Sequence, residues 1–173
     1  INLFTKKDES TISIDDATFK NVDYYVPKIT RGRVIKVYDG DTITVASHIP
    51  ECNKKTYKFS IRLRGIDSPE IRSSSVFEKQ NAMLSRDSLH EKIHNKYIDI
   101  KNVTTEKYGR LLADIYINGV NINEWMIENH YAVAYLGQSK EAIADEHLIN
   151  YEKVIEHVDL TESELALYIN SRS

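Results

Sequence analysis

Three aspartates in two short segments have the spacing of a cation site. Asp39 and Asp41 flank Gly40 in a tight turn, and Asp67 ends a later apolar run. If Asp41 begins a strand, it and Asp39 can point to the same side, because side chains two residues apart share a face. Carboxylate oxygens are ligands that suit calcium or magnesium, and neither segment contains the Cys or His that zinc favours.

Two arginines and a glutamate complete a set of groups that could cleave a phosphodiester. Arg62 and Arg110 each offer a planar, permanently charged fork that fits phosphate oxygens. Glu70 follows Asp67 by three residues, and Pro69 between them fixes one backbone angle. Glu70 is therefore held near the cation without having to bind it, which suits a general base. The set predicts a metal-assisted phosphodiesterase.

The elements that must position these residues can be read from the pattern of apolar residues. β-Branched residues on both sides of the Asp39–Asp41 turn are typical of a hairpin, and Pro69 ends a third strand. We expect strands over residues 32–37, 42–47, 57–66, 97–103 and 110–117, and helices from about 75 to 94, 122–128, 140–157 and 161–171. Residues 1–30 are expected to be an N-terminal extension, and residues 31–173 one domain with an acidic helical end.

Composition bounds the class of protein. The chain has 173 residues, of which 41% are hydrophobic and 28% charged, as in ordinary globular domains. It contains no apolar run of the roughly 18 residues needed to cross a bilayer and no visible signal peptide, although it begins at Ile1 and a segment could precede it. The single Cys52 excludes an internal disulfide. We expect a monomer and leave its compartment open.

Charge is segregated along the chain. Residues 28 to 110 contain 17 Lys and Arg against 10 Asp and Glu, a surplus of seven positive charges. Residues 111 to 173 contain 3 against 11, a surplus of eight negative charges. The positive surplus either gathers on one face or is spread over the surface. We expect a basic face near the motifs, which would attract nucleic acid although the whole chain is acidic.

Three segments, taken in this order, resemble the thermonuclease family (staphylococcal nuclease-like domains): residues 39–42, 62–70 and 107–110. The resemblance covers about residues 32 to 137. It implies a fold that is mainly β with α (OB-fold), a five-stranded barrel with three or four packed helices. It also implies a calcium-dependent endonuclease that acts on DNA and RNA and leaves 3′-phosphates. We expect a preference for single strands or frayed duplex, because the shallow groove of such a barrel must reach the backbone.

The resemblance assigns catalysis to Arg62, Glu70 and Arg110. The two arginines would neutralise the charge that grows on the phosphate, and Glu70 would act on the attacking water. It also assigns three calcium ligands, which are Asp41, Asp67 and the Ser68 backbone carbonyl. Asp39 would lie in the outer shell.

Three further positions match substrate-binding residues of the family. Lys107 and Tyr108 stand where relatives bind a flanking phosphate, and Tyr135 stands where a base is stacked. A second tyrosine of that site is replaced by Gly137, so base binding is expected to be weaker. Tyr135 could instead be a packing residue, since the chain has 11 tyrosines.

Other interpretations are open. The aspartates could be a turn satisfied by its own backbone, and the arginines could form surface ion pairs. A domain of this fold could also bind nucleic acid or protein without cutting. His90, Glu91 and His94 match the zinc-protease pattern H-E-x-x-H, but no third ligand follows in the expected pattern. We interpret these histidines as the flank of an amphipathic helix.

Overall fold

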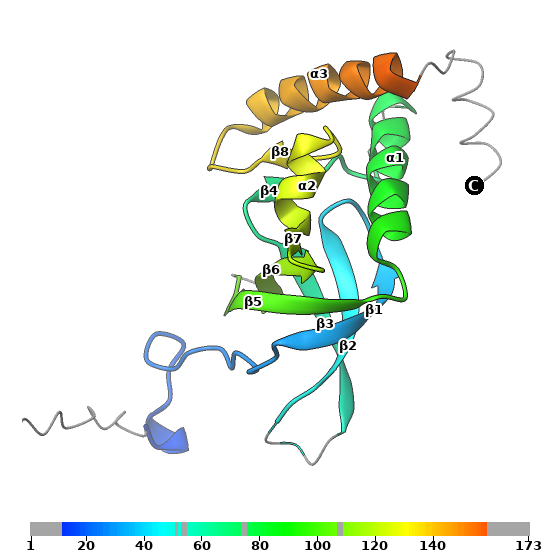
Figure 1. The fold of residues 1–173 in the computed structure, drawn as a ribbon. Coiled ribbons are helices and arrows are strands. Elements are labelled where there is room, and N and C mark those ends of the chain that lie inside the picture. Colours follow the sequence, from blue (N-terminus) through cyan, green and yellow to red (C-terminus); the bar gives the residue numbers. More distant parts are fainter. Residues whose placement is uncertain (1–11, 51, 53–54, 74–75, 107–108, 159–173) are drawn as a thin grey trace, which may run out of the picture.

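Five strands close into a barrel in the computed structural model, which describes residues 12–50, 52, 55–73, 76–106 and 109–158. The barrel strands are β1 (Arg31–Val37), β2 (Thr42–His48), β3 (Thr56–Leu63), β5 (Tyr97–Thr105) and β6 (Leu111–Ile117). Neighbouring strands are antiparallel in the order β3-β2-β1-β5-β6, and a parallel pairing of β3 with β6 closes the barrel (Figure 1). The expected five-stranded OB-type barrel is confirmed.

Alternating apolar residues fill the barrel. In β2 and β3, Ile43, Val45, Ile61 and Leu63 have no exposed surface, and polar residues alternate with them along the strands. Period-two alternation places one side chain in two on the inner face, so a barrel core follows from the sequence pattern. The paired register sets Thr42 opposite Arg62, which brings the start of β2 to the end of β3.

The third strand is shorter than expected. The sequence predicted one strand over 57–66, but β3 ends at Leu63 because Gly65 adopts a left-handed conformation (φ +72°) and turns the chain. Ile66–Asp67 then forms a separate strand, β4, which pairs with β8 (Val133–Ala134). This pairing fixes Asp67 against a segment far along the chain.

Arg64 has a structural role in this turn. Its guanidinium donates to the Thr104 hydroxyl at 2.9 Å and to the Leu112 carbonyl at 3.1 Å, and lies 3.7 Å from Asp114. The two arginines of this segment therefore have different partners. Arg62 faces the carboxylates, whereas Arg64 joins the end of β3 to β5 and β6.

Three helices cover the barrel in the described part of the chain. α1 (Val76–Ile93) buries Leu89 and Ile93 in the barrel core. α2 (Ile122–Glu128) follows the short strand β7 (Val120–Asn121). Asn121 caps its N-terminus, because the Asn121 side chain accepts from two backbone amides of the first turn. The helix predicted over 161–171 lies outside the described residues.

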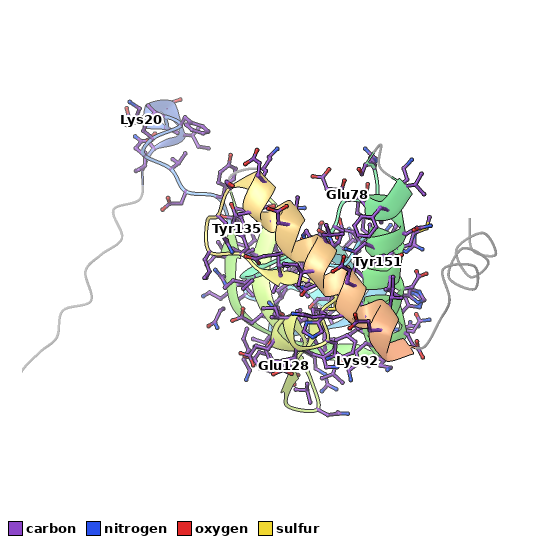
Figure 2. The ribbon with its side chains drawn as sticks, turned by 90° about the horizontal axis from the view of Figure 1, so that it is seen from above. Lys20, Glu78, Lys92, Glu128, Tyr135 and Tyr151 are labelled. Atoms are coloured by element: carbon purple, nitrogen blue, oxygen red, sulfur yellow. The ribbon has the colours of Figure 1, made fainter. Side chains whose placement is uncertain are left out.

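The third helix, α3 (Lys140–Val158), crosses above α1 and α2 (Figures 1 and 2). Tyr151 lies between α3 and α1, where its ring meets that of Phe77 edge to face at 4.5 Å. The Asn81 side chain of α1 also donates to the His147 carbonyl at 3.0 Å. These contacts hold α3 over the end of the barrel where β4 begins.

Residues 12–30, the described part of the chain before the barrel, are largely exposed. They contain one short 3₁₀ helix, η1 (Ile14–Asp16), and exposed apolar side chains such as Phe19 at 88%. The division at residue 30 stays a prediction. Within the described residues, no helix has the length and apolar character needed to cross a membrane.

Candidate active site

The turn between β1 and β2 is held tightly against α1. The Asp41 amide donates to the Asp39 carboxylate at 3.1 Å, which closes the turn. A Cβ atom on Gly40 would lie 1.9 Å from the Ser85 hydroxyl of α1 and 2.8 Å from the Ser68 side chain. Only glycine fits here, so the turn places Asp41 beside the chain that follows β4.

Arg62 connects two of the aspartates. Its Nη1 lies 3.0 Å from one Asp41 oxygen and 3.1 Å from the other, and its Nη2 donates to Asp67 at 2.8 Å. The Ser68 amide and the Thr42 hydroxyl also donate to Asp41, at 3.1 and 2.8 Å. Thus Asp41 of the β1–β2 turn, Arg62 of β3 and Asp67 of β4 lie in contact with one another.

The two carboxylates differ in electrostatics. Burial raises the pKa of the Asp41 carboxyl to about 7, and the charge of Asp39 acts in the same direction, against Arg62 and Thr42. Burial also disfavours the charge of Asp67, but its hydrogen bond with His147 and the charge of Arg62 outweigh burial and lower its pKa. Burial disfavours the charge of Arg62 too, but Asp41 and Asp67 raise its pKa. Asp67 is therefore the more readily ionised of the two carboxyls.

His147 also contacts the site, next to Asp67. Its Nε2 lies 3.3 Å from the Asp67 carboxylate, and the residue is 8% exposed. It comes from α3, 80 residues after Asp67, so local spacing could not have indicated it. The only signal in the sequence is a histidine on the inner face of an acidic amphipathic helix.

Arg110 lies directly before β6 and is paired with Glu106 across the preceding turn. Its Nη1 is 3.4 Å from the Thr42 hydroxyl, which itself donates to Asp41. Arg110 is thus linked to the carboxylates through one hydroxyl group. Neither Glu106 nor Thr42 was predicted as part of the site.

Two adjoining cavities contain the predicted catalytic residues. The α3 cavity, about 590 Å³, extends from Arg62, Glu70 and Arg110 to the first turns of α3, and the turn cavity, about 300 Å³, extends from the same residues to the Asp39–Asp41 turn. Asp67 lines both. Within the described residues the exposed Glu70 side chain makes no hydrogen bond or ion pair. The site therefore offers two guanidiniums and a free carboxylate to one ligand.

The substrate-binding residues are placed only in part. Tyr135 is 47% exposed, lines the α3 cavity and lies near the start of α3 (Figure 2). It is therefore not a core packing residue. Lys107 and Tyr108 lie outside the described residues, so their part in the site stays a prediction.

The family follows from comparison with known proteins. The family model described as "Staphylococcal nuclease homologue" matches residues 60–157, more than half of the chain. The chain belongs to the staphylococcal nuclease family. The match includes Arg62, Asp67, Glu70 and Arg110. It lies further toward the C-terminus than residues 32 to 137, over which the sequence was expected to resemble the family. Asp41 precedes the match and joins the site through the barrel register.

Individual relatives of this staphylococcal nuclease domain share about a third of their aligned residues with it. "Staphylococcal-like nuclease CAN1" of Arabidopsis thaliana is 36% identical over 49% of the chain and 24% of the relative. An "uncharacterized endonuclease" of Escherichia coli O157:H7 is 32% identical over 60% of both chains. An uncharacterized protein of Bacillus anthracis is 30% identical over 68% of the chain and 54% of the relative. The chain thus matches less than two thirds of the length of each of these relatives.

Proposed function

We propose that this protein is a calcium-dependent endonuclease that hydrolyses DNA and RNA, with single strands preferred. Family membership and the nuclease names of relatives support nuclease activity. The observation that favours catalysis over binding alone is that Arg62, Glu70 and Arg110 line the same two cavities, beside Asp67.

The donors near Arg62 fit a hard divalent cation. Asp41 and Asp67 offer only oxygen atoms as ligands. Burial and the nearby Asp39 disfavour the ionised form of Asp41, and a bound cation would favour that form again. In the described part of the chain no three Asp, Glu, His or Cys side chains converge as a complete metal cage. The Ser68 carbonyl and water would therefore complete the shell, with Asp39 outside it. When bound, calcium would supply Lewis-acid chemistry that withdraws charge from the phosphate oxygens.

The residues of the chain would divide the remaining work. Glu70 would accept a proton from the attacking water, for which its carboxylate is free. Arg62 and Arg110 would hold the phosphate and stabilise the charge that grows on its oxygens in the transition state. The P–O bond to the 5′ oxygen would break, which leaves a 3′-phosphate and a 5′-hydroxyl. Tyr135 would contact the base, and Lys107 and Tyr108 a neighbouring phosphate.

Plasmid and oligonucleotide digestion tests this proposal. We expect cutting with calcium, none with EGTA, and a loss of at least about 100-fold in Glu70→Ala, in the range typical of a lost general base. Glu128→Ala removes an exposed carboxylate at the end of α2 and should cut normally. Cutting that survives both EGTA and Glu70→Ala would disprove the mechanism. Tight binding of single strands with no cutting would favour the binding module instead.

A further inference from the structure

A third cavity adjoins the proposed active site. It has a volume of about 530 Å³ and lies between the end of β1, the loop after β4, and α1. We name it the flanking cavity; the residues of interest in its wall are Lys36, Tyr38, Arg72, Arg86, Asp87 and His90. Tyr38 and Arg72 line the turn cavity as well. These two residues therefore form part of the wall of both cavities.

The flanking cavity has a positive surplus. Its wall contains three basic side chains, Lys36, Arg72 and Arg86, and one acidic side chain, Asp87. Arg86 lies 2.8 Å from Asp87, and this pair is partly buried. Lys36 and Arg72 are exposed, and within the described residues neither forms an ion pair. Their charges are available to an anionic ligand.

An aromatic ring stands at the junction of the two cavities. Tyr38 is 44% exposed, and the Lys36 ammonium lies 5.7 Å from the centre of its ring. Tyr38 immediately precedes the Asp39–Asp41 turn, which packs against α1 (Figure 1). An exposed ring between cationic side chains is the usual arrangement for single-stranded nucleic acid, because bases stack on the ring while phosphates meet the charges.

We infer that the flanking cavity binds the single strand next to the bond that is cut. In this arrangement the strand leaves the turn cavity across Tyr38, one base stacks on that ring, and the neighbouring phosphates contact Lys36 and Arg72. Arg86, held by Asp87, forms the far wall. This inference rests on the proposed nuclease function and extends its substrate from one phosphodiester to a strand of several nucleotides.

The test compares long and short substrates in the full chain. The variant Lys36→Ala/Arg72→Ala should lose about tenfold or more in kcat/KM on a 12-nucleotide single strand and change less than twofold on a dinucleotide, which cannot reach the flanking cavity. The matched control Lys58→Ala/Lys101→Ala removes two exposed charges from β3 and β5 and should leave both rates unchanged. Equal losses in the control, or on the dinucleotide, would overturn the inference.

A binding measurement separates this inference from the nuclease proposal. With Glu70→Ala as the background and calcium present, affinity for a fluorescent 12-nucleotide strand should fall with rising salt. Adding Lys36→Ala/Arg72→Ala should flatten the slope of log affinity against log salt by about 1.4, since each phosphate contact on a single strand contributes about 0.7. Tyr38→Leu should weaken binding about tenfold without changing that slope. An unchanged slope, or equal affinity for an acidic peptide, would reject the subsite even if the enzyme cuts.

Discussion

At the scale of single residues, Asp41 has two opposed tendencies. It accepts hydrogen bonds from Ser68 and Thr42 and lies against Arg62, yet burial and Asp39 still raise its pKa to about 7. Arg62 is shared with Asp67, so its charge does not belong to Asp41 alone. A carboxyl that is poorly stabilised as an anion is suited to a cation, because the cation supplies the missing charge.

Calcium affinity should therefore depend on pH. Below about pH 7 the Asp41 carboxyl holds a proton, and calcium must displace it, so the apparent affinity should fall by up to about tenfold per pH unit. Titration calorimetry at pH 5.5, 6.5 and 7.5 measures this. Asp41→Asn should bind calcium more weakly and with a smaller pH dependence. Equal affinity of the wild type at all three pH values would contradict the role of Asp41.

Arg110 should act mainly in the transition state. Arg110→Ala should lower kcat about 100- to 1,000-fold with little change in substrate affinity, as when one donor to a developing oxyanion is removed. Arg110→Lys keeps the charge but loses the fork, and should recover only part of the rate. The control is Glu106→Gln, which weakens the ion pair of Arg110 and should keep most of the activity. Steady-state kinetics with a single-stranded oligonucleotide decide the matter.

At the scale of elements, α3 contributes to the site through His147, and the β1–β2 turn contributes through its packing on α1. Two contacts fix α3 on α1: the Tyr151 ring of α3 packs against Phe77, and the Asn81 side chain of α1 donates to the backbone of α3. The turn is fixed by the close approach of Gly40 to Ser85. Both contacts lie outside the barrel, so the helices help to set the positions of Asp41 and Asp67.

Removal of His147 should weaken calcium binding. His147→Ala takes away the group that orients the Asp67 carboxylate at 3.3 Å, and loss of such a supporting contact typically costs about 10- to 100-fold in metal affinity. The control on the same helix is Glu152→Ala, an exposed residue, which should bind calcium normally. If His147→Ala lowers only the thermal midpoint and leaves calcium affinity intact, the histidine serves packing alone.

A methyl group at position 40 should displace the turn. In Gly40→Ala the new atom would lie 1.9 Å from the Ser85 hydroxyl, so the turn or the helix must move, at a cost of about 1 to 3 kcal/mol in the free energy of unfolding. Calcium affinity should fall as well, because Asp41 follows directly. Adding Ser85→Ala removes the closest contact and should recover part of both losses. Denaturant unfolding and calorimetry measure the two effects, and purely additive losses would argue against this contact.

At the scale of the whole molecule, charges of opposite sign lie close to one another. The segment from residue 28 to 110 has the positive surplus and contains the flanking cavity, whereas α3, which belongs to the acidic segment, covers one side of the α3 cavity. A polyanion that approaches the site is therefore attracted from one side and repelled from the other.

Neutralising α3 should accelerate the capture of nucleic acid. Asp145→Asn/Glu146→Gln removes two exposed negative charges from α3 and should raise kcat/KM several-fold at 50 mM salt, with the gain lost near 0.3 M salt because of screening. Glu124→Gln/Glu128→Gln makes the same charge change on α2 and should have a smaller effect. A gain that persists at high salt, or is equal in both variants, would show that local repulsion by α3 is not the cause.

The sequence by itself was sufficient for the parts of the protein that depend on local pattern. The period-two alternation of 32–37 and 42–47 predicted β1 and β2 to within one residue at each end, and the apolar positions of 122–128 predicted α2 with its observed bounds. The order of the aspartate, arginine and glutamate motifs indicated the family, because the residue types that bind a cation and a phosphate are few.

Only the tertiary structure decided which distant groups meet. Barrel closure and the register of β2 with β3 bring Asp41 to Arg62, and the pairing of β4 with β8, after the turn at Gly65, sets Asp67 in place. The packing of α3 on α1 then brings His147 to Asp67 across 80 residues. Such contacts depend on how the barrel and the three helices pack together. Short-range periodicity predicts which face of an element is buried, but it does not predict which other element covers that face.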